Sequence, residues 1–168
     1  MKKLFLIALL FTSYSYAQEG EINGDFQLNL QSYKDDARIG AIAPDEIILN
    51  NSFFNLMYSK GNFSTGVRYE SYLNALLDYD SDFQGNSIAY RYASYSLDNL
   101  DVTVGNYYEQ FGSGLVFRTY ENKGLGVDNA MDGVRVKYNI LNSIDIKSFI
   151  GKSRTYLEYS DGIIRGID

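Results

Sequence analysis

The clearest secondary-structure signal in the chain is Met131-Asp132-Gly133-Val134-Arg135-Val136-Lys137-Tyr138-Asn139-Ile140, followed by Leu141-Asn142-Ser143 and then Ile144-Asp145-Ile146-Lys147. Apolar and polar residues alternate on both sides of the break, which is the period of a β-strand whose two faces meet different surroundings. Asn and Ser at the break suit a tight turn. This stretch predicts two antiparallel strands, 131–141 and 144–153, joined by a hairpin.

The same alternation recurs along most of the chain. It is found in the segments Phe26–Gln31, Phe54–Ser59, Val67–Leu73, Ile88–Ala93 and Leu100–Gly105. The chain contains 16 Tyr, 10 Phe, 15 Gly and a single Pro, and aromatic residues favour strands while Gly favours turns. We therefore expect an all-β, antiparallel fold of about eight strands.

The expected connections alternate in length. Short turns are predicted at 60–62, 98–99 and 142–143, and longer links at 35–46, 74–84 and 154–161. Strand 100–111 ends, and strand 131–141 begins, at the same end of the sheet. Residues 112–130 must therefore lie beyond that end, fold back into the space that the sheet encloses, or contain an even number of strand passes. An alternative is one long strand through 100–120 with a glycine bulge at Gly112–Gly114.

Composition excludes much of the usual chemistry of active sites. The chain has no Cys, no His and no Trp, so a Ser-His-Asp triad, a thiol nucleophile and a His- or Cys-ligated metal are all impossible. We expect no catalytic residue, no cofactor and no metal site. Asp78, Asp80 and Asp82 have the oxygen-rich spacing of a calcium loop, but the full twelve-residue pattern is absent, which favours a solvated acidic loop.

Residues 1–17 have the three-part layout of a secretory signal peptide. Lys2-Lys3 precedes an apolar run from Leu4 to Phe11, and small residues surround Ala17, after which we expect cleavage. The apolar run is too short for the roughly 20 residues of a spanning helix. Removal of this segment leaves 13 basic and 21 acidic residues, a net charge of −8, which argues against nucleic acid as a partner.

A signal peptide, many aromatic residues near strand ends, and polar strand faces that carry both charges together favour a transmembrane β-barrel over a soluble β-sandwich. Charges such as Arg68 and Glu70 suit a wet lumen and would be awkward in a sandwich core. About eight strands fit into residues 18–168. Because the final stretch 162–168 looks like a strand that has only begun, we expect a chain incomplete at its C-terminus and part of a larger barrel.

Several motifs together resemble an uncharacterised outer-membrane β-barrel family of Bacteroidota, the domain-of-unknown-function family numbered 6029. They are Gly66–Glu70, Ile88–Tyr92, Gly105–Arg118, Asp128–Arg135 and Gly162–Gly166. The resemblance covers roughly residues 45–168. It implies an outer-membrane barrel that extends beyond residue 168, and it transfers no catalytic or ligand residue.

Charged residues on the polar strand faces are the candidate lumen-lining set. This set is Arg68, Glu70, Arg91, Glu109, Arg118, Arg135 and Lys137. They either form a charge ring that sets selectivity or pair with one another to stiffen the lumen. In the segment 109–118, with Glu121, the choice is between a constriction and a bulged turn with structural ion pairs.

Three functions stay open at this point. The first is a porin-like or scaffold protein of the outer membrane, without catalytic activity and in contact with outer-membrane lipids. The second is a secreted soluble β-protein for binding or adhesion, which should extract in aqueous buffer without detergent. The third is an enzyme embedded in a barrel, for which only Ser/Lys or acid-pair chemistry survives.

Overall fold

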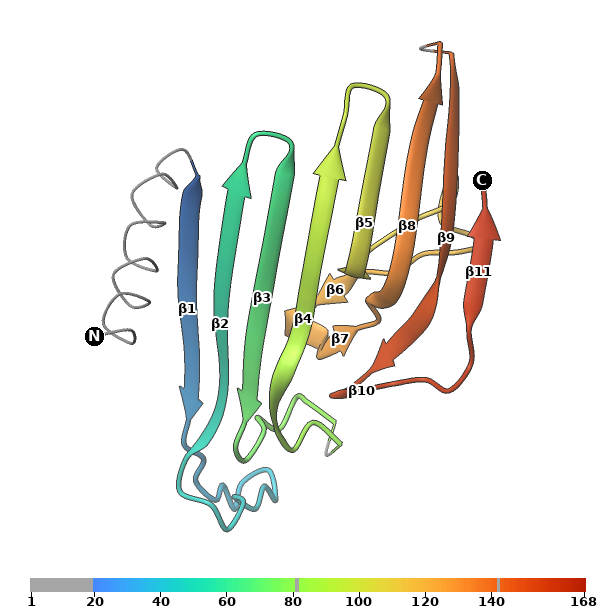
Figure 1. Ribbon diagram of the computed structural model, residues 1–168. Helices are drawn as coiled ribbons and strands as arrows, with labels where there is room; N and C mark the ends of the chain where they lie inside the picture. Colours follow the sequence, from blue (N-terminus) through green and yellow to red (C-terminus); the bar gives the residue numbers. More distant parts are fainter. Residues whose placement is uncertain (1–19, 81, 142) are drawn as a thin grey trace, which may run out of the picture.

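The computed structural model describes residues 20–80, 82–141 and 143–168, and shows an all-β, antiparallel fold (Figure 1). The predicted signal peptide, 1–17, lies outside the described residues. The elements are β1 (Glu21–Gln31), β2 (Leu49–Lys60), β3 (Phe63–Tyr72), β4 (Gly85–Ser96), β5 (Leu100–Tyr107), β6 (Glu121–Asn122), the 3-10 turn η2 (Lys123–Leu125), β7 (Val127–Asp128), β8 (Met131–Ile140), β9 (Ile144–Thr155), β10 (Glu158–Tyr159) and β11 (Ile164–Ile167). No helix in the described ranges is long and apolar enough to cross a membrane.

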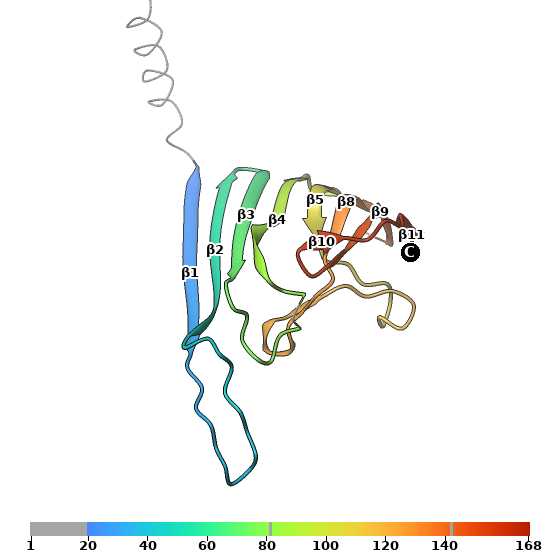
Figure 2. The same ribbon diagram turned by 90° about the horizontal axis from the view of Figure 1, so that it is seen from below.

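The main sheet is a meander in which each strand pairs with the next one in order, except that β5 pairs directly with β8. β11 pairs with β9 at the other side of the sheet from β1. The sheet is strongly curved when seen along its strands (Figure 2). Within the described residues β1 and β11 are not paired with each other, so closure into a barrel stays a prediction.

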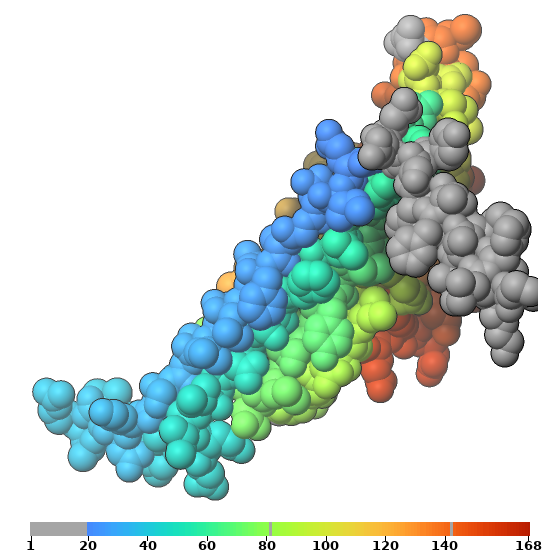
Figure 3. Space-filling model, turned by 60° about the vertical axis from the view of Figure 1, so that its left-hand side comes forward, coloured from blue at the N-terminus to red at the C-terminus, as the bar shows by residue number. Residues whose placement is uncertain are grey.

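Connection lengths alternate as the sequence predicts. The strand pairs β2–β3, β4–β5 and β8–β9 are joined by short turns at one end of the sheet, and the long links 32–48, 73–84 and 108–130 lie at the other end (Figure 1). Gly61 has φ 54° in the first short turn, a left-handed conformation that Gly adopts without a steric penalty. The link 32–48 projects well beyond the ends of β1 and β2 (Figure 3).

The convex face of the sheet carries apolar side chains that no other element of the described residues covers. Direct cross-strand partners share a face, and here these partners are apolar pairs such as Phe54–Tyr69 and Val134–Ile150. Large apolar residues exposed on this face are Ile22, Phe26, Leu28, Leu30, Phe54, Leu56, Phe63, Val67, Tyr69, Ile88, Tyr95, Val104, Val134, Tyr138, Ile144, Ile146, Ile150 and Ile167.

The concave face carries polar and charged side chains such as Arg68 and Glu70. Residues 108–130 fold back over it (Figure 2). β5 ends at Tyr107, so the alternative of one long strand through 100–120 is wrong. Gly112 and Gly114 instead lie in a tight turn: their φ angles are 49° and 86°, and the Phe111 amide donates to the Phe117 carbonyl across it. Two short pieces, β6 and β7, pair as a small hairpin further along. We call residues 108–130 the inserted segment.

Two aromatic clusters hold the inserted segment and the neighbouring link against the sheet. Phe111 and Phe117 of the inserted segment pack on Phe149 of β9, with ring centroids 5.2 and 4.5 Å away. Near β3, Tyr72 and Phe83 pack with ring centroids 5.0 Å apart. The buried apolar contacts of this chain are therefore concentrated on the concave face.

Candidate functional site

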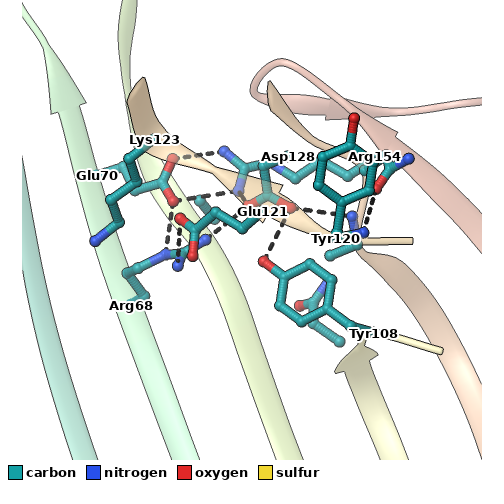
Figure 4. Close-up of polar contacts among 12 residues, drawn as sticks. Arg68, Glu70, Tyr108, Tyr120, Glu121, Lys123, Asp128 and Arg154 are labelled. Carbon is teal, nitrogen blue, oxygen red and sulfur yellow. Dashed lines mark hydrogen bonds and ion pairs between the residues drawn. The ribbon is translucent and has the colours of Figure 1, made fainter. Parts of the chain in front are cut away.

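The β6–β7 hairpin meets the sheet through a group of charged side chains that we call the Glu70 cluster: Arg68 and Glu70 of β3, Glu121 and Asp128 of the hairpin, and Arg154 of β9 (Figure 4). Alternation along β3 directs Arg68 and Glu70 away from the exposed Val67 and Tyr69. Arg154 lies near the end of β9, where its amide donates to the Ala130 carbonyl at 2.8 Å, and its side chain reaches the same place (Figure 4).

Each guanidinium in the Glu70 cluster is shared between carboxylates. Arg68 contacts Glu70 at 2.7 Å, Glu121 at 2.9 Å and Asp128 at 2.7 Å. Arg154 contacts Glu70 at 2.5 Å and Asp128 at 2.6 Å, and its Nε donates to the Tyr156 carbonyl at 2.6 Å. Glu70 and Arg154 side chains are each 1% exposed. Such short, multiply bonded charge pairs are among the strongest polar contacts in proteins.

Tyrosines complete the hydrogen bonding of the acids. The Tyr72 hydroxyl donates to Glu70 at 2.9 Å, and the Tyr108 hydroxyl donates to Asp128 at 3.0 Å. Burial, followed by the negative charges of Asp128 and Glu121, raises the pKa of Tyr108 well above its usual range. Tyr108 therefore stays a neutral donor in the folded protein.

Three carboxylates of this cluster, those of Glu70, Glu121 and Asp128, converge with oxygen atoms within 4.8 Å of one another. That spacing would suit a divalent cation. However, the guanidinium groups of Arg68 and Arg154 already lie between these oxygens. The arrangement neutralises charge inside the protein and leaves the carboxylates committed to arginine.

A second group of charges lies on β5, β8 and β9, and we call it the Glu109 cluster: Glu109 of the inserted segment with Asp101, Arg135, Lys137 and Lys147. Glu109 is 3.1 Å from Lys137 and 3.8 Å from both Arg135 and Lys147. Arg135 also contacts Asp101 at 3.2 Å. The Glu109 cluster therefore contains three cations and two carboxylates, whereas the Glu70 cluster contains two cations and three carboxylates.

The candidate lumen residues divide between these clusters, with two exceptions. Arg68 and Glu70 belong to the first cluster, and Glu109, Arg135 and Lys137 to the second. Arg118 is exposed on the inserted segment, with its guanidinium 5.0 Å from the centre of the Tyr120 ring.

Arg91 lies on the other face of the sheet. It stands opposite Val67 across β3 and β4, on the convex face, and pairs with Asp132 at 3.1 Å. The alternation of Tyr90, Arg91 and Tyr92 predicted that Arg91 lies on the inward, polar face. In the structure the two tyrosines face inward instead, and the Arg68 guanidinium lies over the Tyr90 ring. Arg91 is therefore not a lumen-lining residue in this structure.

Sequence reasoning missed Arg154, Asp128, Asp101 and Lys147. Lys147 and Asp101 lie on polar strand faces and carry the same alternation signal as Lys137, so this pattern alone points to them. Arg154 and Asp128 lie in links or at strand ends, where alternation fails, and only the folding back of the inserted segment brings them to Glu70.

A comparison with protein families assigns the chain as a whole. The model of a family of unknown function, DUF6029, matches residues 1–168. The chain belongs to the DUF6029 family. The search against curated proteins gives no match. The match confirms the family number predicted from the sequence and extends it from roughly residues 45–168 to the whole chain.

Proposed function

We propose that this DUF6029 protein is an outer-membrane β-barrel of a Bacteroidota bacterium, of porin-like or scaffold type and without catalytic activity. In this proposal residues 1–17 direct export and are removed. The convex face contacts outer-membrane lipids, and the concave face lines a lumen that is partly filled by the inserted segment.

One observation carries the proposal: the polarity of the sheet is inverted relative to a water-soluble protein. Eighteen large apolar side chains are exposed on the convex face, on β1 to β5, β8, β9 and β11. The most buried charges, Glu70 and Arg154, lie on the opposite face. A soluble monomer rarely leaves an apolar surface of this extent uncovered, whereas lipid-facing strands require it.

The unpaired edge of β1 agrees with the same environment. All eleven residues of β1 are exposed, and within residues 20–80, 82–141 and 143–168 their backbone groups bond to β2 on one side only. In a membrane every backbone polar group must be hydrogen-bonded, so such an edge requires pairing with another strand. Closure of the curved sheet would supply that pairing.

The cluster geometry speaks against the enzyme alternative. Acid-pair catalysis needs a carboxyl group free to exchange a proton with substrate. The acids Glu70 and Asp128 instead accept hydrogen bonds from Arg154 and from tyrosines. These contacts support a structural use of the acids.

Membrane fractionation of the full-length protein tests the localisation. The protein should remain in the outer-membrane fraction after extraction with high salt and with urea, and should migrate differently on gels before and after heating. Release into aqueous buffer without detergent would instead support the secreted soluble β-protein.

Cysteine labelling tests the assignment of the two faces, since the chain contains no native Cys. We expect a fluorophore on Val134→Cys or Ile150→Cys to be quenched by spin-labelled lipid chains. A fluorophore on Lys137→Cys, on the concave face, should be quenched by a soluble quencher instead. Equal lipid quenching at all three positions would contradict the proposed orientation.

A further inference from the structure

The Glu109 cluster contains more positive charge than its carboxylates balance. Lys137 of β8 and Lys147 of β9 are direct cross-strand partners, an arrangement that is unfavourable for like charges unless an anion lies between them. The only acids in contact with the three cations, within the described residues, are Asp101 and Glu109. Asp101 is the direct cross-strand partner of Lys137, but its ion pair is with Arg135. Glu109 is therefore the acid that forms ion pairs with both lysines.

Glu109 comes from the inserted segment and not from the wall that holds the cations. Its backbone is fixed to Thr119, whose amide donates to the Glu109 carbonyl at 2.9 Å and whose hydroxyl accepts from the Glu109 amide at 2.8 Å. Phe111 and Phe117 pack on Phe149, the cross-strand partner of Arg135. The carboxylate is thus held over the cations by a separate piece of chain.

The two lysines remain accessible in spite of this contact. The side chains of Lys137 and Lys147 are 39% and 32% exposed, whereas the Glu109 side chain is 4% exposed. Glu109 Oε2 also has no hydrogen-bond partner of good geometry, although it is buried. The two lysines therefore have donors free for oxygen atoms other than those of Glu109, although Lys147 also donates to the Gln110 carbonyl. Arg135 donates to the Tyr108 carbonyl, Asp101 and Thr103, so it contributes mainly its charge.

We propose that Arg135, Lys137 and Lys147 form a binding site for the carboxylate group of an anionic solute, and that Glu109 occupies it as a tethered internal competitor. The inference rests on the proposed function in one respect, namely that solutes reach the site through a lumen. A tethered group competes at an effective concentration in the millimolar range. The site is therefore selective for small anions present at high concentration or carrying more than one carboxylate.

The test is a calorimetric titration of the purified full chain with succinate, a dicarboxylate probe. The wild type should bind weakly. Glu109→Gln removes the competing charge but keeps the oxygen that accepts from the Gln110 amide, and should bind succinate at least tenfold more tightly. Addition of Lys137→Gln to that variant should abolish the gain.

Glu121→Gln is the matched control, because Glu121 lies on the same inserted segment but contacts Arg68 in the other cluster. It should bind succinate as the wild type does. An equal gain in Glu121→Gln would mean a general charge effect and would overturn the proposal, as would no gain in Glu109→Gln. If Glu109→Gln lacks the circular dichroism spectrum of the wild type, Glu109→Asp replaces it in the test. The shorter side chain moves the carboxylate away from the cations, so this variant should bind succinate several-fold more tightly than the wild type does.

Failure of this inference is separable from failure of the proposed function. If the chain extracts into aqueous buffer, the outer-membrane assignment falls, and the same titration in that buffer still decides whether the anion site exists. If the chain is a membrane protein but Glu109→Gln gains no affinity, only the anion site is rejected.

Discussion

The two faces of the sheet differ in what they bury. The convex face presents apolar side chains such as Leu56 and Val134 to its surroundings, while the concave face encloses Glu70, Arg68 and Arg154 beneath the inserted segment. In a soluble protein the hydrophobic effect fills the interior with apolar groups. Here the concave face buries ion pairs and aromatic clusters together, while the convex face leaves its apolar side chains exposed, and this contrast supports the proposed lipid-facing surface.

The largest effect should come from breaking the Glu70 cluster. Glu70→Gln leaves Arg68 and Arg154 buried with one carboxylate fewer, and removal of one partner from a buried ion pair costs about 3–5 kcal/mol. Urea unfolding of the refolded protein, followed by circular dichroism, measures this loss. A loss below about 1 kcal/mol would show that the concave face is not held by these charges.

A charge on the convex face should have the next largest effect. Leu56→Lys places a cation on the apolar face and should cost about 2–4 kcal/mol in a lipid environment. The neighbouring Asn55→Lys is the matched control, because Asn55 faces inward. A lysine there has Asp25 opposite it on β1 and Arg68 opposite it on β3, so the opposed pairings largely offset each other. Unfolding in detergent or lipid should separate the two variants clearly. Equal small costs would mean that the convex face meets water.

Removal of the Tyr108 hydroxyl should have a moderate effect. Tyr108→Phe loses the hydrogen bond to ionised Asp128 and should cost about 1.5–3 kcal/mol at pH 7, the range for hydrogen bonds to charged groups. Because burial raises the pKa of Tyr108 in the folded protein, folding favours its neutral form. Its contribution is therefore fully present below the unfolded pKa of about 10 and falls as pH rises above that value.

The pH dependence supplies a separate measurement for Tyr108. Unfolding curves between pH 8 and pH 11, as rough limits around the usual tyrosine pKa, should show a steeper alkaline loss of stability in the wild type than in Tyr108→Phe. Parallel curves would show that Tyr108 titrates normally, and that the junction between the hairpin and the sheet is open to solvent.

The smallest effect on stability is expected from Glu109→Gln. Glu109 itself is buried, but its lysine partners are about one-third exposed, so water can solvate them once the carboxylate is gone. The loss should therefore be well below that of Glu70→Gln, whose arginine partners are both buried. The same unfolding assay as for Glu70→Gln makes the comparison direct. Equal losses in the two variants would show that the Glu109 cluster is as structural as the Glu70 cluster.

Much of the architecture could be predicted from local sequence, because successive residues of a strand point to opposite faces and so alternate in polarity when the two faces meet different surroundings. The alternation in 131–140 and 144–150 located β8 and β9 and their hairpin. The parity of the connections required residues 112–130 to begin and end on the same side of the sheet. Alternation also placed Arg68, Glu70, Arg135 and Lys137 on polar faces. The prediction was wrong for Arg91. Tyrosine occurs on apolar and polar faces alike, so the flanking tyrosines do not show which face of the strand is apolar.

By itself the sequence determined the all-β class, the strand positions, the alternation of short and long connections and the exclusion of His and Cys chemistry. Each of these follows from residue type and spacing, which act over a few neighbouring residues. Only the tertiary structure decided that the inserted segment folds over the concave face, that Arg154 reaches Glu70 from 84 residues away, and that Glu109 sits among three cations. Those contacts join distant segments through chain reversal and packing, and no local period in the sequence encodes them.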